Sequence, residues 1–213
     1  MSRLTITAIA AGLVTVTGLI AVIAVATRGE SSNPSSPADL YRGSEPPGVN
    51  RLPTFRLPNV DGKTVDSALL RGKVTVVTFV DSACHESCPI IIGVIGQALP
   101  QLTPRERRQV AALALSVDPK VDSPAHVDRF LRERHALGQL DYLVAPERTM
   151  RPVWSAFHVL PATDSGDADV HSGGVRIFDR EGVWVSNLHA GVDLSAANLI
   201  HDIREALTRS ASR

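Results

Sequence analysis

The spacing of apolar positions in this 213-residue chain changes sharply along its length. The first pattern is an unbroken apolar run, Leu4–Ala26, which contains neither a charged residue nor a proline. As a helix, these roughly 23 residues would be about 34 Å long, and the hydrocarbon core of a bilayer is about 30 Å thick. The run therefore predicts a transmembrane helix at residues 4–26.

The flanks of this run indicate its orientation. Arg3 precedes it, and the polar segment after it carries Arg28 followed by Glu30. Because positively charged flanks tend to stay in the cytoplasm, we expect a single-pass protein of the cell membrane with an extracytoplasmic globular part. The small residues Ala24 and Ala26 also suit a signal-peptidase site, so a cleaved signal peptide is the alternative. Either interpretation takes most of the chain out of the cytoplasm.

Residues 27–51 are rich in Ser, Pro and Gly and show no apolar period. A segment of this composition buries too little apolar surface to offset the entropy lost on ordering. We therefore expect a flexible tether at 27–51, followed by one folded domain at 52–209.

Within this domain, the pattern alternates between strands and helices. Lys73–Val80 and Gln109–Asp118 are nearly continuous apolar runs, which is typical of strands buried on both faces. Helices are expected from about Pro89 and after the N-cap Ser123. The other expected elements are a hairpin at Asp61-Gly62, a strand at Leu140–Ala145, a helix at Glu147–Val159 interrupted near Pro152, a hairpin with its turn at Arg180–Gly182, and a helix at Asp193–Arg209. This order predicts an α/β fold with a central mixed sheet flanked by helices.

The charge balance excludes one class of function. Lys and Arg together number 22, and Asp and Glu together also number 22, so the net charge is zero. A protein without a basic field has no electrostatic means of holding a polyanion. Nucleic-acid binding is therefore not expected.

The candidate chemistry lies where the first buried strand meets the first helix. Cys84 and Cys88 are the chain's two cysteines, and their spacing permits a disulfide. A following helix N-terminus is expected to lower the thiol pKa. Three interpretations compete: a structural disulfide, a redox dithiol, and a metal site. The first would stabilise weakly because the closed loop is short, and the third needs a further ligand.

Seven histidines offer that ligand, and Cu(I) would accept a Cys-Cys-His set. His85 lies between the cysteines, but its adjacency to Cys84 turns its side chain away. His189 closes the late hairpin. His171 precedes a strand after a Gly/Asp-rich loop, a position that can present a side chain at the end of the sheet. Asp81 could tune the thiols, and Asp118 could orient the site or simply form a turn.

Three segments, "RGKVTVVTFVDSACHESCP", "LSVDPKVDSP" and "VHSGGVRIFDREG", resemble the SCO/SenC family of copper chaperones for cytochrome oxidase assembly. The similarity covers roughly Phe55–Leu207. It implies a thioredoxin-like fold and a copper ion bound by Cys84, Cys88 and His171, with the cysteines also forming a redox-active pair.

The resemblance implies a membrane-anchored, extracytoplasmic protein that delivers copper to the binuclear copper centre of a respiratory cytochrome c oxidase. Its partner would be the copper-bearing subunit of that oxidase. The leading alternative is a thiol-disulfide reductase that keeps the copper-site cysteines of the oxidase reduced. A redox-sensing or purely structural module would need neither a metal nor partner thiols.

Overall fold

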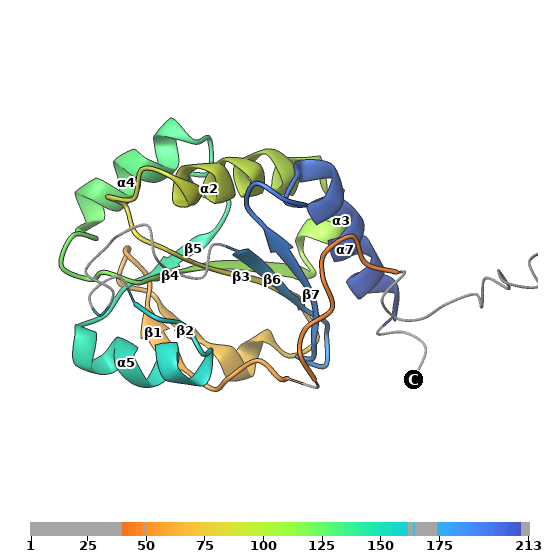
Figure 1. The fold of residues 1–213 in the computed structure, drawn as a ribbon, viewed down its shortest axis with the longest axis horizontal. Coiled ribbons are helices and arrows are strands. Elements are labelled where there is room, and N and C mark those ends of the chain that lie inside the picture. Colours follow the sequence, from red (N-terminus) through yellow and green to blue (C-terminus); the bar gives the residue numbers. More distant parts are fainter. Residues whose placement is uncertain (1–39, 49, 162–163, 165–173, 210–213) are drawn as a thin grey trace, which may run out of the picture. The chain divides into compact units, whose positions relative to one another are not determined.

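The computed structural model describes residues 40–48, 50–161, 164 and 174–209. A five-stranded mixed sheet of order β5-β4-β3-β6-β7 forms its centre (Figure 1). β3, β4 and β5 run parallel, whereas β6 is antiparallel to both β3 and β7. The strands are β1 (Arg56–Pro58), β2 (Thr64–Asp66), β3 (Val74–Val80), β4 (Val110–Ser116), β5 (Asp141–Leu143), β6 (Gly174–Phe178) and β7 (Trp184–His189).

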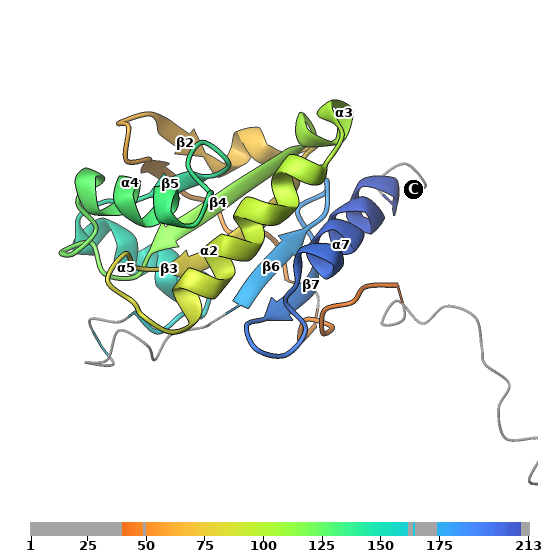
Figure 2. The ribbon, with the colours of Figure 1, turned by 90° about the horizontal axis from the view of Figure 1, so that it is seen from above.

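Helices cover both faces of this sheet. α2, α4 and α7 lie over one face, and α5 lies on the other with the β1-β2 hairpin (Figures 1 and 2). The helices are α2 (Ser87–Ala98), α3 (Pro104–Arg107), α4 (Pro124–Glu133), α5 (Glu147–Ala156) and α7 (Ala196–Arg209), with short 3-10 helices η2 (Ser67–Leu70) and η3 (Leu99–Gln101).

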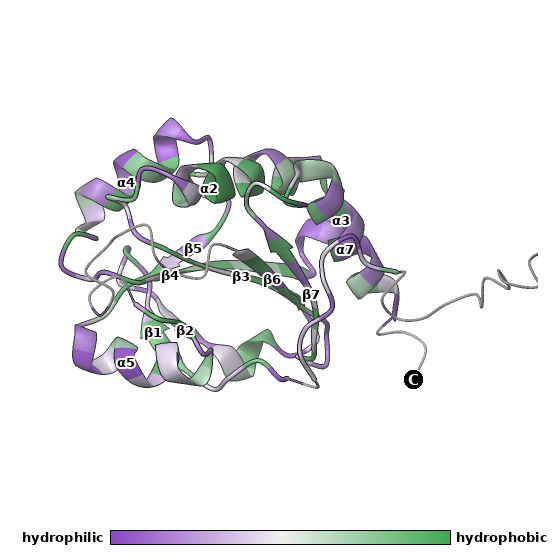
Figure 3. Ribbon diagram, viewed as in Figure 1, coloured by the Kyte–Doolittle hydropathy of each residue, from purple (hydrophilic) through white to green (hydrophobic). Residues whose placement is uncertain are grey.

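The central strand β3 is buried on both faces, as its sequence predicts. Its side chains alternate, so Val76 and Val80 join the core beneath α2 and α7, while Val77 and Phe79 join the core that contains Trp154 of α5. Figure 3 shows the hydrophobic residues concentrated in the sheet and in α2, while α4 carries many hydrophilic ones. The expected mixed α/β fold is thus observed, with two cores separated by one sheet.

One expected helix differs from its prediction. The sequence predicts an interruption near Pro152, but α5 continues through this residue. Proline removes one helical hydrogen bond, which costs most where the orphaned carbonyl cannot reach water. Pro152 and Arg148, four residues earlier, are both exposed. The buried side chains of Met150 and Trp154 hold the helix to the sheet on its opposite side.

The chain before Leu52 also differs in part from the flexible tether expected at 27–51. Tyr41 is buried, and Ser44 forms a bridge to Asn187 on the outer strand β7. Trp184 also donates its backbone N–H to the carbonyl of Asn50 at 2.8 Å. The described residues of this stretch therefore pack against the domain, because they pair with a sheet edge that would otherwise expose its backbone groups.

The predicted transmembrane helix Leu4–Ala26 lies outside the described residues. Across the ranges that the structure describes, no helix is both long and apolar enough to cross a bilayer.

Candidate dithiol and metal site

The two cysteines lie at the junction between β3 and α2. Cys84 belongs to the loop after Val80, and Cys88 is the second residue of α2. Their exposed fractions are 2% and 0%, and both are thiols in this structure. The backbone N–H of Cys88 donates to Sγ of Cys84 at 3.4 Å, so the helix start and the first thiol are in direct contact. The structure thus brings together the predicted pair.

The electrostatics of this pair differ from the prediction. Because Cys88 lies in the first helical turn, the sequence predicts a lowered thiol pKa. Instead, the pKa of Cys88 is raised above its usual range. The largest cause is the hydrogen bond between the side chains of Cys88 and Cys84, and the second is burial. A backbone hydrogen bond at Asp81 opposes this shift. The hydrogen bond with Cys84 and the removal of the anion from water therefore outweigh this opposing hydrogen bond.

A buried carboxylate beneath the cysteine loop determines the course of the loop. Oδ1 of Asp122 accepts the backbone N–H of Ser82 at 2.7 Å. Its Oδ2 accepts the hydroxyls of Ser116 at 2.6 Å and Tyr142 at 2.8 Å. One side chain therefore connects the loop after β3 to the end of β4 and to β5.

Burial raises the pKa of Asp122 because removal from water disfavours the anion, although its hydrogen bonds act in the opposite direction. Burial also raises the pKa of Tyr142, and the negative charge of Asp122 adds to that shift. Neither residue is predicted from the sequence as part of the site. The available signal was a second aspartate four residues after Asp118, in the segment between a buried strand and a helix.

The two aspartates considered from the sequence have distinct surroundings. Asp81 is completely buried, and its Oδ1 accepts the backbone N–H of Ala83 at 2.9 Å. Asp118 is half-buried and accepts the backbone N–H of Lys120 at 3.0 Å. Asp81 therefore shapes the cysteine loop from within, whereas Asp118 closes a local turn, which was one of the roles expected for it.

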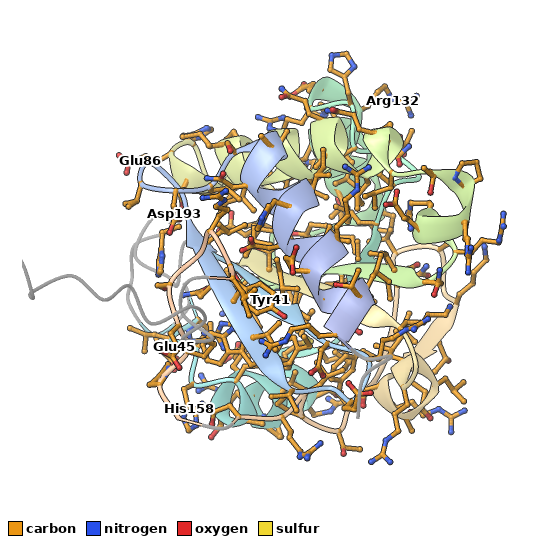
Figure 4. The ribbon with its side chains drawn as sticks, turned by 90° about the vertical axis from the view of Figure 1, so that its right-hand side faces the viewer. Tyr41, Glu45, Glu86, Arg132, His158 and Asp193 are labelled. Carbon is orange, nitrogen blue, oxygen red and sulfur yellow. The ribbon has the colours of Figure 1, made fainter. Side chains whose placement is uncertain are left out.

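The structure describes two of the three candidate histidine ligands. His171 lies outside the described residues. His85 is exposed on the cysteine loop, and His189 ends β7. Figure 4 shows Glu86, the neighbour of His85, on the same side of the domain as Asp193, which follows β7. Among the residues that the structure places, no three His, Cys, Asp or Glu side chains are close enough to hold a metal ion.

A cleft of about 360 Å³ opens beside Cys84. One wall is the cysteine loop from Ser82 to His85, and the other is α4 with Arg134, the residue after it. Cys88 does not line this cleft, so a reactant that enters it meets Cys84 first. The lining residues contributed by α4 and its C-cap are His126, Arg129, Phe130, Glu133 and Arg134.

The mixed sheet and the buried thiol pair at a strand-to-helix junction define a thioredoxin-like dithiol protein. The chain belongs to the SCO1/SenC family, whose model matches residues 45–208. It is 21% identical over 156 residues to an SCO2-like protein of Rickettsia typhi, covering 70% of this chain and 74% of that protein.

Solved structures support the same fold. ScoI of Bradyrhizobium japonicum with copper bound is 25% identical and covers 73% of this chain and 98% of its own, with a TM-score of 0.58. BsSco is described as a member of the Sco family of cytochrome c oxidase assembly proteins with a disulfide switch. It is 21% identical and covers 77% of this chain and 97% of its own, with a TM-score of 0.63.

Proposed function

We propose that this protein binds copper through Cys84, Cys88 and His171 and delivers it to the copper-bearing subunit of a respiratory cytochrome c oxidase. A membrane helix at residues 4–26 would hold it there, with the globular domain on the extracytoplasmic side. Family membership supports the copper and oxidase parts of this proposal. The anchor rests on the apolar run alone.

The observation that carries the proposal is the pair of buried thiols in direct contact at the start of α2. Two sulfur donors suit Cu(I), which favours soft ligands and accepts low coordination numbers. Burial also limits the access of water and of competing hard cations. The donor set present therefore fits copper, with one further ligand needed to complete it.

The sheet register supports His171 as that ligand. Thr78 pairs with Val175, and its hydroxyl donates to the carbonyl of Gly174 at 2.9 Å, so β6 starts at the edge where β3 ends. His171 precedes Gly174 by three residues. Three extended residues span at most about 11 Å, a separation along the chain that is short enough for a ligand role at this edge.

His189 is the competing imidazole at this edge, since it pairs with Gly174. Its Nε2 lies 2.8 Å from the Asn187 side-chain amide, and its Nδ1 lies 3.9 Å from Oδ1 of Asp193. Whichever atom of the amide faces the ring, Nε2 is engaged in this hydrogen bond. Copper ligation through Nε2 of His189 would require breaking it, which favours His171.

Transfer would proceed by exchange of ligands between the two proteins, and oxidation of the dithiol would release the metal. The reductase function remains the second candidate, and the cleft beside Cys84 favours it. A thiol bordered by a cleft can exchange with an incoming disulfide, while the buried Cys88 completes the reaction from behind.

The test is copper stoichiometry and affinity of the reduced full chain. We expect about one equivalent of Cu(I), and we expect Cys84→Ser or Cys88→Ser to weaken binding at least about 100-fold, since each removes a thiolate ligand. Ser87→Ala lies between them and serves as the matched control, with near-parental affinity expected. If either cysteine variant binds as the parent does, the proposed ligand set is wrong.

A further inference from the structure

We propose that the cleft beside Cys84 binds small thiols that carry a negative charge, and that Arg129 selects them. Such a compound, with glutathione as the representative, would reduce the Cys84–Cys88 disulfide. This inference rests on the dithiol part of the proposed function and is independent of copper.

The cleft offers access to only one sulfur of the pair. Cys84 lines it, whereas Cys88 lies behind Cys84 with no exposed surface. Its volume of about 360 Å³ is enough for a compound of a few residues but not for a folded domain. Phe130, buried in the core beneath α4, provides an apolar part of the lining. The site therefore suits a small molecule with a thiol at one end.

The charges along α4 leave one guanidinium available at this cleft. Arg132 forms an i,i+4 ion pair with Asp128. Arg134 pairs with Glu133 at 2.8 Å, and its guanidinium carbon lies 4.3 Å from the centre of the Phe130 ring. Arg129 is exposed, lines the cleft, and forms no ion pair with another described residue. Its positive charge is therefore available to a carboxylate.

His126 adds an oriented group on the same wall. Its Nδ1 lies 2.9 Å from the carbonyl oxygen of Val121, and because a carbonyl only accepts, Nδ1 carries the proton. This bond fixes the ring at the first turn of α4, so that the wall beside Arg129 is held in place. Glu86, which follows His85, does not line the cleft, and the lining carboxylate Glu133 is paired with Arg134.

The reaction is an ordinary thiol-disulfide exchange. The thiolate of the small compound attacks Sγ of Cys84, the Cys84–Cys88 bond breaks, and Cys88 leaves as a thiolate that takes up a proton. A second molecule attacks the sulfur of the first in the mixed disulfide and releases Cys84 as a thiolate. Two small thiols are oxidised to one disulfide, and the protein disulfide is reduced to two thiols.

The experiment measures how fast three thiols reduce the oxidised full chain: glutathione (net negative), 2-mercaptoethanol (neutral) and cysteamine (positive). Each rate is compared between parent and variant, so that the intrinsic reactivity of each compound cancels. At low ionic strength we expect Arg129→Gln to slow glutathione about fivefold, to leave 2-mercaptoethanol unchanged, and to leave cysteamine unchanged or faster. The glutathione effect should shrink in high salt because charges near the surface are screened.

Arg132→Gln is the matched control, because Arg132 is on the same helix but paired with Asp128. It should leave the rate of each of the three thiols equal to that of the parent. If Arg129→Gln slows all three thiols equally, or none, the proposal is overturned. A cysteine peptide flanked by aspartates is measured as a fourth reductant. If only this peptide responds to Arg129→Gln, the cleft serves a protein segment and the proposal is also overturned. A parent chain that forms no Cys84–Cys88 disulfide removes both the dithiol function and this proposal. If the disulfide forms and is reduced, but the effect of Arg129→Gln does not depend on the charge of the thiol, this proposal alone is removed.

Discussion

Two buried aspartates, Asp122 and Asp202, hold two different segments of this domain. Asp122 accepts the Ser82 amide of the cysteine loop together with two hydroxyls. Asp202 of α7 accepts the amides of Arg42 at 2.7 Å and Gly43 at 3.0 Å. Each carboxylate therefore fixes an irregular segment by satisfying backbone N–H groups that would otherwise be unpaired.

The partners of the two carboxylates differ. The three donors to Asp122 are neutral and come from the loop after β3, from the end of β4 and from β5. Asp202 also accepts the hydroxyl of Ser186 at 2.6 Å and has a ring nitrogen of His201 at 3.0 Å. The first carboxylate thus belongs to the dithiol site, whereas the second holds the segment that leads into the domain. We expect their removal to have separable consequences.

The largest effect is expected for Asp122→Ala. This change leaves the Ser82 amide and the hydroxyls of Ser116 and Tyr142 without their acceptor. Because a buried polar group that loses its partner is left with the full cost of its removal from water, the free energy of unfolding should fall by about 3 kcal/mol. Denaturant unfolding of the reduced full chain measures it, and alkylation of Cys84 should become faster as the loop loosens. Unchanged stability together with unchanged alkylation would contradict the role given to Asp122.

A smaller effect is expected for Asp202→Ala, about 2 kcal/mol, because part of the released segment can reach water. Hydrogen exchange should show lost protection at Arg42, Gly43 and Ser44, while the alkylation rate of the cysteines stays the same. Gly43→Ala should act similarly, since a Cβ there would lie 2.3 Å from the Ser186 hydroxyl oxygen. Faster alkylation in these variants would show that the two segments are coupled.

The smallest effect concerns pH. Burial raises the pKa of Asp122 from an ordinary value of 3.8, so the folded protein binds a proton that the unfolded chain releases above that pH. The contribution of this group is then fully present below pH 3.8 and declines as pH rises towards the folded pKa. Asp122→Asn cannot titrate, so the stability of the parent relative to this variant should fall over that window. A relative stability that rises with pH would contradict the assigned direction.

Much of the fold could be predicted from local pattern. The runs that form β3 and β4 are continuous and apolar, and Ser123 caps α4 with its hydroxyl as expected. Local pattern could not show that Pro152 is accommodated, because that depends on which side of α5 faces water. Nor could it show that residues near Tyr41 pack, because Asp202 lies 160 positions after Arg42.

The features of the site also divide into those that the sequence predicts and those that it does not. The paired cysteines and their position at a strand-to-helix junction follow from the sequence. The direction in which the pKa of Cys88 shifts does not, because it depends on the hydrogen bond with Cys84 and then on burial. Asp122 and Tyr142 were missed because the position of Asp122 after a buried strand is only a weak signal, and its partners Ser82, Ser116 and Tyr142 come together only in the folded sheet. The ligand role of His171 remains a prediction.

The most direct test of the central claim is therefore the Cu(I) affinity of His171→Ala beside His85→Ala and His189→Ala, each in the reduced full chain. If His171 is the third ligand, its loss should weaken binding more than tenfold, at least about 1.4 kcal/mol. The other two variants should bind as the parent does, and the Cys84–Cys88 disulfide should still form in all three. Parental copper affinity in His171→Ala, with a loss in His85→Ala or His189→Ala, would contradict the account.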